Sequence, residues 1–379
     1  MDTGATRDHP DLHDPVWDRA AGALAGAAAA TALTGTSPAA RSTPVPAPLA
    51  RLIRAALTDL NAGTALPHPP PDPLDHAWAQ ALRTLVLTAA PPRTLLEHTP
   101  ADRPPSASWR ALTRTPVPAH DPARGIFACH HLTRAVRSAH AAAGDLTAMY
   151  TGALAGARWG FSALPLRSLR HLAADPHTLV TDALTAARGH RTSSWPHAPI
   201  RTGPSRRLPP FAVPHPLDDQ VLLGNLDHLR THPDSADAAV SLCRTHPDDA
   251  PHLPARDWTR VWLHDRPGAN PNLHFALDEA AAAVATLRAE GKRVLLHCWA
   301  GASRTPAVAA RYAAAHLGAP ALPTLALLIR TVGGHLDNPT LARAVAALSG
   351  QDLPEAAAHL FPDGIPPRRP ELPEPHNTG

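Results

Sequence analysis

The sequence predicts two domains, an N-terminal all-α bundle and a C-terminal α/β domain with a mainly parallel central sheet flanked by helices. At 379 residues, the chain is longer than one typical domain. Apolar residues recur at helical spacing in the first half, whereas short apolar runs alternate with helical segments in the second. A stretch without periodicity and rich in chain breakers separates the two patterns. The predicted parts are residues 1–188 (helical), 189–210 (linker), 211–350 (α/β) and 351–379 (a loose, proline-rich tail).

Composition and charge exclude several classes of protein. The formal net charge is +3 and the basic residues are dispersed, so neither a nucleic acid nor a membrane surface is an expected partner. The cysteines, Cys129, Cys243 and Cys298, are widely spaced, which indicates neither a disulfide framework nor a zinc site. A reducing, cytoplasmic location fits them, and no apolar run is long enough to span a membrane. No metal and no cofactor are predicted, and no pattern sets an oligomeric state.

The helical half is predicted to hold about six helices separated by proline-rich connectors. Residues 20–33 are mostly alanine and glycine, whose small side chains allow two helix backbones to pack closely. Acidic residues precede this segment, whereas a signal peptide begins with positive charge, so a buried helix is expected. The other expected helices are residues 49–62, 75–89, 127–143, 146–159 and a segment from 166 onward, with connectors at 66–73 and 99–105.

The α/β half is predicted to alternate strands with helices, which favours parallel strand pairing. Residues 226–232 are expected to form a turn or the beginning of a helix. The expected strands are residues 221–223, 238–243, 261–263 and 294–296, and the expected helices are residues 273–290, 306–316, 321–332 and 339–348.

The strand expected at residues 294–296 runs into a loop that carries Cys298 and, six positions later, Arg304. A strand-to-helix loop directs several backbone N–H groups and the positive end of a helix dipole at one place, which suits a phosphate dianion. A helix N-terminus and a nearby guanidinium both favour a thiolate, so the pKa of Cys298 is expected to be depressed. Arg304 adds a planar, bidentate grip on two phosphate oxygens.

This loop resembles the signature of the cysteine-dependent protein tyrosine phosphatases. His297 and Cys298 are followed, after five residues, by Arg304 and Thr305, and Gly301 lies inside the loop. The surrounding sequence looks most like the dual-specificity branch of that family. The resemblance implies the cysteine phosphatase fold and a hydrolase whose substrate is a phosphorylated protein or a small phosphoester.

The resemblance extends beyond the loop and covers roughly residues 211–350. Residues 221–225 resemble an early strand and turn of the family, and residues 337–339 resemble the segment before its last helix. Asp265 lies 33 positions before Cys298 (298 − 265 = 33), at the spacing of the family's general acid.

The resemblance also implies roles for the loop residues. Cys298 is the expected nucleophile and forms a phosphocysteine, while Arg304 and the loop amides hold the phosphate oxygens. The expected phosphate-binding residues are Trp299, Ala300, Gly301, Ala302, Ser303 and Arg304. Trp299 either offers a ring face to an aromatic phosphoester or packs against a neighbouring loop. Ser303 either fits the dual-specificity pattern or is simply a small loop residue.

Three further side chains complete the expected site. Asp265 is the expected acid, which protonates the leaving group and then activates water, with Asp278 as the alternative. Thr305 is expected to donate to the nucleophile and to help the thiolate leave, and its hydroxyl is also compatible with a helix N-cap. His297 is expected to support the loop and to tune the thiolate.

The loop residues give less support to two related classes of phosphatase, those that act on inositides and those that act on RNA 5′ ends. No lysine or second arginine lies between Cys298 and Arg304, although inositide-directed relatives usually carry basic residues there. The asparagine that relatives acting on RNA 5′ ends tend to place before the arginine is absent as well. Sulfur-transfer enzymes also hold a reactive cysteine in an anion-binding loop, and a non-catalytic module that binds phosphorylated ligands is the main alternative. Asp265 together with Cys298 and Arg304 favours an enzyme, because a binder has no need of a nucleophile.

The helical half resembles a second family, the ADP-ribosylglycohydrolases, over roughly residues 16–188. The matching segments are Arg19 to Ala28, Thr151 to Gly160 and Ala163 to Pro165. The resemblance implies two magnesium ions, held by an early threonine-aspartate run and by a late aspartate-rich motif.

This sequence departs from that family at the metal-binding positions. The early acidic run is absent, Thr31 stands where a glycine-aspartate pair is sought, and the late motif is reduced to residues 144–147 with one aspartate. One aspartate cannot hold two ions, so a scaffold or binding module without hydrolase activity is expected, and residual ADP-ribosyl hydrolase activity is the alternative. After Cys129, the adjacent His130 and His131 point different ways on a helix, so no metal is assigned to them.

Overall fold

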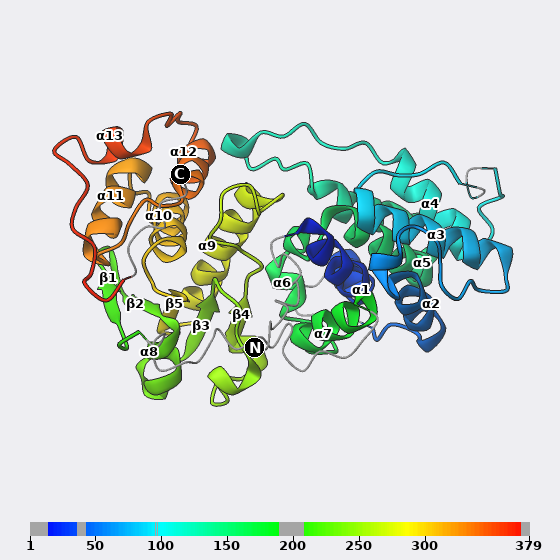
Figure 1. Ribbon diagram of the computed structural model, residues 1–379, viewed down its shortest axis with the longest axis horizontal. Helices are drawn as coiled ribbons and strands as arrows, with labels where there is room; N and C mark the ends of the chain where they lie inside the picture. Colours follow the sequence, from blue (N-terminus) through cyan, green and yellow to red (C-terminus); the bar gives the residue numbers. More distant parts are fainter. Residues whose placement is uncertain (1–13, 36–42, 95, 97, 189–207, 373–379) are drawn as a thin grey trace, which may run out of the picture.

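The computed structural model describes residues 14–35, 43–94, 96, 98–188 and 208–372, and it has a mixed α/β fold (Figure 1). The helices of the first half are α1 (Pro15–Thr34), α2 (Ala47–Leu57), α3 (Pro73–Thr88), α4 (Pro104–Arg114), α5 (His130–Trp159), α6 (Leu166–Leu169) and α7 (Pro176–Ala187). The elements of the second half are β1 (Ala212–His215), β2 (Asp218–Asn225), α8 (Leu226–Thr231), β3 (Ala238–Ser241), β4 (Trp258–Arg260), α9 (Leu273–Ala289), β5 (Val294–Cys298), α10 (Arg304–His316), α11 (Ala321–Thr331), α12 (Pro339–Leu348) and α13 (Ala356–Leu360). Of the expected linker, only residues 208–210 lie within the described ranges.

Helices α1 and α5 pack with their backbones in direct contact, as the small residues of α1 predict. A Cβ atom added to Gly26 would lie 2.2 Å from the carbonyl oxygen of Gly152, and one added to Gly156 would lie 1.9 Å from that of Gly22. Most of α1 is buried, so the expectation of a buried helix is confirmed. Each described helix is too short or too polar to cross a membrane.

The other helices follow the sequence prediction with four differences. The segment expected from residue 166 onward forms two helices, α6 of four residues and α7, which begins at Pro176. The helices expected at residues 127–143 and 146–159 form the single element α5, which is broken where Gly144 has a φ of +77°. The helix expected at residues 49–62 ends at Leu57, and a separate 3-10 turn follows it. Helix α4 was not expected because its prolines resemble a connector, whereas proline in the first turn of a helix has no N–H to lose.

The sheet has the strand order β1-β2-β5-β3-β4, and β5 lies at its centre. Strands β2, β5, β3 and β4 are parallel, as expected, and β1 pairs antiparallel with β2 at the edge. The strand expected at residues 261–263 is wrong in position, because β4 ends at Arg260 and the buried residues after it are coil. Strand β1 escaped prediction because it is short, half-exposed and contains Pro214, which only an edge strand tolerates.

Helices α9 and α10 pack against β5, and α11 and α12 pack against α10. The helices up to α7 lie on the other side of α9 and β4 (Figure 1). The two halves share one continuous cluster of buried apolar side chains. Hydrogen bonds also join them: Glu279 of α9 accepts from the Leu166 amide at 2.7 Å, and Asn272 donates to the Trp159 carbonyl at 2.6 Å.

The end of the described chain is ordered against the sheet half, where the sequence predicts a loose tail. Helix α13 forms there, and Leu353, Phe361 and Leu372 are buried. Leu372 packs with Leu208 and Ala302. These apolar residues lie between prolines and without helical spacing, so the sequence pattern conceals them.

Candidate active site

The loop between β5 and α10 surrounds the sulfur of Cys298. Cys298 is the last residue of β5 and is buried, and its Sγ accepts a hydrogen bond from the Gly301 amide at 3.2 Å. Gly301 has a φ of +71°, and a Cβ atom there would lie 2.6 Å from the Gly224 carbonyl oxygen. Only glycine fits this conformation and this approach to β2, so the loop depends on it.

The carbonyl groups of the loop are bound from outside. Trp299 O accepts from the Leu226 amide at 3.3 Å, and Ala302 O accepts from the His335 amide at 3.2 Å. The carbonyl of Ala300 accepts from Arg369 Nη2. Because N–H and C=O point in opposite directions in a trans peptide group, the amides that follow these carbonyls point away from these outer partners, and that of Gly301 faces Cys298 Sγ. The loop is therefore a nest of N–H donors, the arrangement that binds an oxyanion.

Arg304 begins α10 and is fixed by one end of its guanidinium. Its Nη1 donates to the carbonyl of Leu242, just after β3, at 2.7 Å and to that of Leu263, in the coil after β4, at 3.1 Å. Its Nε is buried, has no hydrogen-bond acceptor among the described residues, and lies 3.5 Å from Asp265 Oδ2. The Nε edge is thus available to an anion, while the opposite edge holds the side chain in place.

Asp265 lies over the same loop, as the sequence predicts. Its Oδ1 accepts from Ser303 Oγ at 2.9 Å and from Asn338 Nδ2 at 3.2 Å. It belongs to the segment between β4 and α9. Within this segment, Asn270 Oδ1 accepts from the His264 amide at 2.7 Å and Asn270 Nδ2 donates to the His264 carbonyl at 2.9 Å, which holds the backbone on either side of Asp265 together. The side chain of Asp265 is 27% exposed, so it meets both solvent and the partly buried Arg304.

Of the candidate acids, the structure brings only Asp265 to the loop. The alternative, Asp278, lies on α9 and pairs with Arg311 at 2.7 Å. Asn338 has no predicted role, although it lies in residues 337–339, which resemble the segment before the last helix of the phosphatase family. A signal for that role exists, because Asn338 directly precedes the proline that begins α12 and is therefore fixed at the end of a loop.

The thiol of Cys298 is electronically distinct from the other two. Burial raises its pKa, but the Arg304 guanidinium and the hydroxyl and amide of Thr305 outweigh this, so the net pKa is below the usual value. Burial instead raises the pKa of Cys129 and of Cys243 to about 12. Cys298 is therefore the cysteine that favours the nucleophilic thiolate.

Thr305 and Trp299 each had two possible interpretations. Ser303 occupies the N-cap position of α10, although its hydroxyl donates to Asp265 and not to the helix, so the N-cap interpretation of Thr305 is wrong. The Thr305 hydroxyl is buried without a well-aligned hydrogen bond among the described residues, yet it favours the Cys298 thiolate. Trp299 packs against the cluster that includes Ala302, which agrees with the packing interpretation.

His297 supports the base of the loop from within β5. The Trp258 Nε1–H donates to Ser241 Oγ at 2.8 Å, and that oxygen lies 2.6 Å from His297 Nε2. The other ring nitrogen, Nδ1, lies 3.3 Å from the Cys298 carbonyl oxygen, which can only accept. Burial lowers the pKa of His297 to about 4, so the ring is neutral and its proton is on Nδ1. His297 thus holds the peptide group of the nucleophile.

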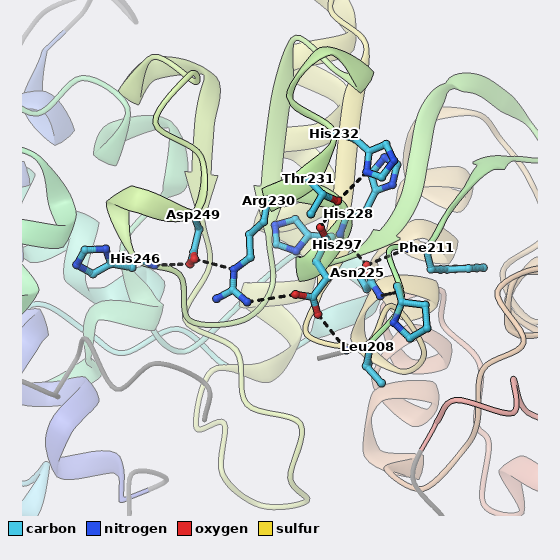
Figure 2. Close-up of polar contacts among 12 residues, drawn as sticks. Leu208, Phe211, Asn225, His228, Arg230, Thr231, His232, His246, Asp249 and His297 are labelled. Atoms are coloured by element: carbon cyan, nitrogen blue, oxygen red, sulfur yellow. Dashed lines mark hydrogen bonds and ion pairs between the residues drawn. The ribbon is translucent and has the colours of Figure 1, made fainter. Parts of the chain in front are cut away.

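A second polar network supports the end of β2 beside the loop (Figure 2). Asn225 Oδ1 accepts from the amides of Phe211 at 3.1 Å and His228 at 2.9 Å. Arg230 joins Asp227 and Asp249. Since Asn225 pairs in register with Cys298, this network fixes the strand that Gly301 approaches.

Comparisons of this chain with protein-family models, with curated proteins and with solved structures return no match. The described residues contain no group of three or more histidine, cysteine, aspartate or glutamate side chains that would hold a metal ion. The site brings together a thiolate-favouring cysteine, the Gly301 amide that faces its sulfur, a guanidinium whose Nε edge faces Asp265, and the Asp265 carboxyl group.

Proposed function

We propose that the chain is a cysteine-dependent phosphomonoester hydrolase of the dual-specificity phosphatase type, acting on phosphotyrosine, phosphoserine or phosphothreonine through a phosphocysteine. One observation carries this proposal: the buried Cys298, with a lowered pKa, shares one loop with Arg304, and Asp265 closes over that loop. A site that only binds phosphate has no use for a poised thiolate or for a proton donor.

In the first step, the Cys298 thiolate attacks phosphorus, and the bond from phosphorus to the ester oxygen breaks as the S–P bond forms. The loop amides and the Nε edge of Arg304 hold the equatorial oxygens. Asp265 Oδ2 lies 3.5 Å from Arg304 Nε, and a phosphate oxygen takes that place beside Arg304 when substrate binds. Protonated Asp265 gives its proton to the leaving oxygen, because an alkoxide or phenolate is a poor leaving group.

In the second step, water attacks the phosphocysteine, Asp265 takes a proton from that water, and the S–P bond breaks. Inorganic phosphate leaves and the thiolate returns. Thr305 assists here because its hydroxyl favours the charged sulfur. Ser303 and Asn338 hold one carboxyl oxygen of Asp265, which keeps the other oxygen available for proton transfer in both steps.

We further propose the cysteine phosphatase fold for residues 211–350 and a separate ADP-ribosylglycohydrolase-like domain without hydrolase activity for residues 1–188. The parallel order of β2, β5, β3 and β4 around the cysteine loop supports the first proposal. The second is supported by Asp145, whose side chain is 60% exposed and pairs with His140 instead of joining other carboxylates. Residues 189–210 are the proposed linker, and the reducing cytoplasm, which suits a free catalytic thiol, is the proposed location.

The proposal is tested by hydrolysis of p-nitrophenyl phosphate between pH 5 and 8. Cys298→Ser is expected to lose at least about a thousandfold in kcat, whereas Cys243→Ser, at the buried neighbour of high pKa, keeps its activity. Asp265→Asn is expected to lose about a hundredfold on phosphotyrosine peptides. If the wild type binds a phosphotyrosine peptide but never hydrolyses it, the chain is a binding module. Magnesium-dependent release of ADP-ribose that survives Cys298→Ser would place a hydrolase in the helical half.

A further inference from the structure

One peptide group connects Cys298 to a residue near the end of the described chain. The N–H of the Ala300–Gly301 peptide donates to Cys298 Sγ at 3.2 Å. The carbonyl of the same peptide accepts a hydrogen bond from Arg369 Nη2. Arg369 thus holds, from outside the loop, the peptide that faces the sulfur from inside.

Arg369 is itself firmly placed. Its backbone amide donates to the Gly333 carbonyl at 2.9 Å, and its guanidinium lies 3.5 Å from the centre of the Phe211 ring. Its Nη1 is 3.4 Å from Glu371 Oε1, and the side chain is 11% exposed. The stack on Phe211 and the backbone bond to Gly333 set the direction of the guanidinium, whose Nε and Nη1 make no hydrogen bond to the described residues.

The neighbouring arginine binds the other side of the site. Arg368 pairs with Asp337 at 2.8 Å, and Asp337 directly precedes Asn338, which binds the Asp265 carboxyl. The consecutive arginines therefore reach the two parts that meet at the site, the cysteine loop and the segment that holds the acid.

The Ala300–Gly301 peptide needs such a partner. A glycine changes its backbone conformation readily, and Gly301 already lies at a φ of +71°. Without a donor on the Ala300 carbonyl, rotation of this peptide would turn the carbonyl toward the thiolate and the N–H away from it. An inward carbonyl repels both the thiolate and a bound phosphate.

We propose that Arg369 is a positioning residue of this site, which fixes the Ala300–Gly301 peptide with its N–H toward Cys298 and so makes the C-terminal segment part of the oxyanion-binding loop. The inference rests on the proposed function for its meaning in catalysis. The position of the Ala300–Gly301 peptide affects the reactivity of Cys298 and the binding of an oxyanion, and both can be measured without turnover.

The test uses Arg369→Met in the full chain. Methionine keeps an apolar stem over Phe211 but has no donor for the Ala300 carbonyl. Arg369→Lys retains a charged donor of similar length. Arg343→Met is the matched control, since Arg343 Nη2 also donates to a backbone carbonyl, that of Pro354, away from the loop.

The readouts are the rate of Cys298 alkylation by iodoacetamide from pH 5 to 9, its protection by inorganic phosphate, and kcat/KM on p-nitrophenyl phosphate. Arg369→Met is expected to slow alkylation at pH 7 about tenfold and to raise the half-protecting phosphate concentration about tenfold. Arg369→Lys is expected to restore most of the alkylation rate and most of the protection by phosphate. Arg343→Met is expected to match the wild type in both. Loss of packing alone would lower the melting temperature without moving the pH midpoint of alkylation.

An alkylation profile and a phosphate protection in Arg369→Met equal to those of the wild type would overturn the inference, whether or not the wild type hydrolyses esters. A wild type that hydrolyses nothing, but whose alkylation and protection respond to Arg369→Met as stated, removes the proposed function and supports the positioning role. If Arg369→Met does not fold, Arg369→Gln replaces it, since its amide is too short to reach the Ala300 carbonyl, and the same changes are expected.

Discussion

Asp265 and Ser303 are joined by a hydrogen bond of 2.9 Å that connects the segment after β4 to the cysteine loop. They are 38 residues apart in the chain, and one belongs to the proposed acid segment while the other occupies the N-cap position of α10. The contact fixes how far the carboxyl group stands from the sulfur of Cys298. The cysteine loop thus sets the position of Asp265, the proposed acid.

Ser303→Ala is expected to lower kcat about three- to tenfold and to leave KM nearly unchanged, because it frees the Asp265 carboxyl without altering the phosphate-binding amides. The loss should be larger on phosphotyrosine than on p-nitrophenyl phosphate, since nitrophenolate needs less help from an acid. Steady-state kinetics on both substrates measure this. Ser349→Ala, at a serine that binds only a helix carbonyl, serves as the control. Equal losses on the two substrates would contradict the positioning of the acid.

Folding stability is expected to depend on Glu279 between pH 5 and 8. Burial raises the pKa of this carboxyl to about 7, and the Leu166 amide acts in the opposite direction. Because the folded pKa lies above the unfolded one, the protonated group favours folding, and its contribution is lost as pH rises toward and past 7. Relative to Glu279→Gln, the wild type should lose about 2 kcal/mol of unfolding free energy between pH 5 and 8. Urea unfolding at several pH values measures the difference, and parallel curves for the two proteins would refute it.

His297 is expected to stay neutral, with its proton on Nδ1, down to pH about 4, because burial lowers its pKa to that value. The folded pKa lies below the unfolded one, so the stability due to the neutral ring is present above pH about 6.5 and is lost as pH falls through 4. Nitrogen NMR of the labelled ring reports both the tautomer and the midpoint. A midpoint near 6.5, or a proton on Nε2, would contradict the hydrogen-bond assignment to the Cys298 carbonyl.

Gly156→Ala is expected to cost about 2–4 kcal/mol of stability, because its Cβ atom would lie 1.9 Å from a backbone oxygen of α1 and the helices would have to separate. Gly144→Ala in the same helix is the matched control. Nothing lies within 4 Å of its Cβ position, so its cost is limited to the roughly 1–3 kcal/mol of a backbone conformation, φ +77° and ψ −170°, that is nearly exclusive to glycine. Chemical denaturation of both variants separates the two effects, and equal costs would show that the helix contact adds nothing.

The sequence predicts the elements whose signals are local. The periodicity of α9 to α12 and the apolar run of β5 lie in continuous segments, and the motif around Cys298 indicates where to seek Arg304 and Asp265. The boundary of β4 was misplaced because buried residues continue past Arg260 as coil, and apolar character alone does not separate the two.

Arg369, in contrast, gave no local signal. Arg369 lies 71 positions after Cys298 (369 − 298 = 71), among prolines in a segment without periodicity. Its contact with the Ala300 carbonyl exists only because the chain returns across Gly333 and Phe211. The bond from Asn338 to Asp265 likewise depends on two loops meeting over the sheet, which no spacing in the sequence expresses.

Leu208 and Leu372 meet on Ala302, so the two ends of the sheet half come together at one residue of the cysteine loop. Chain ends that are adjacent in space can be joined without disturbing the residues between them. The place where the two ends of the sheet half meet is thus the cysteine loop itself. The packing of Ala302, and with it the shape of the cysteine loop, therefore depends on both ends of the sheet half.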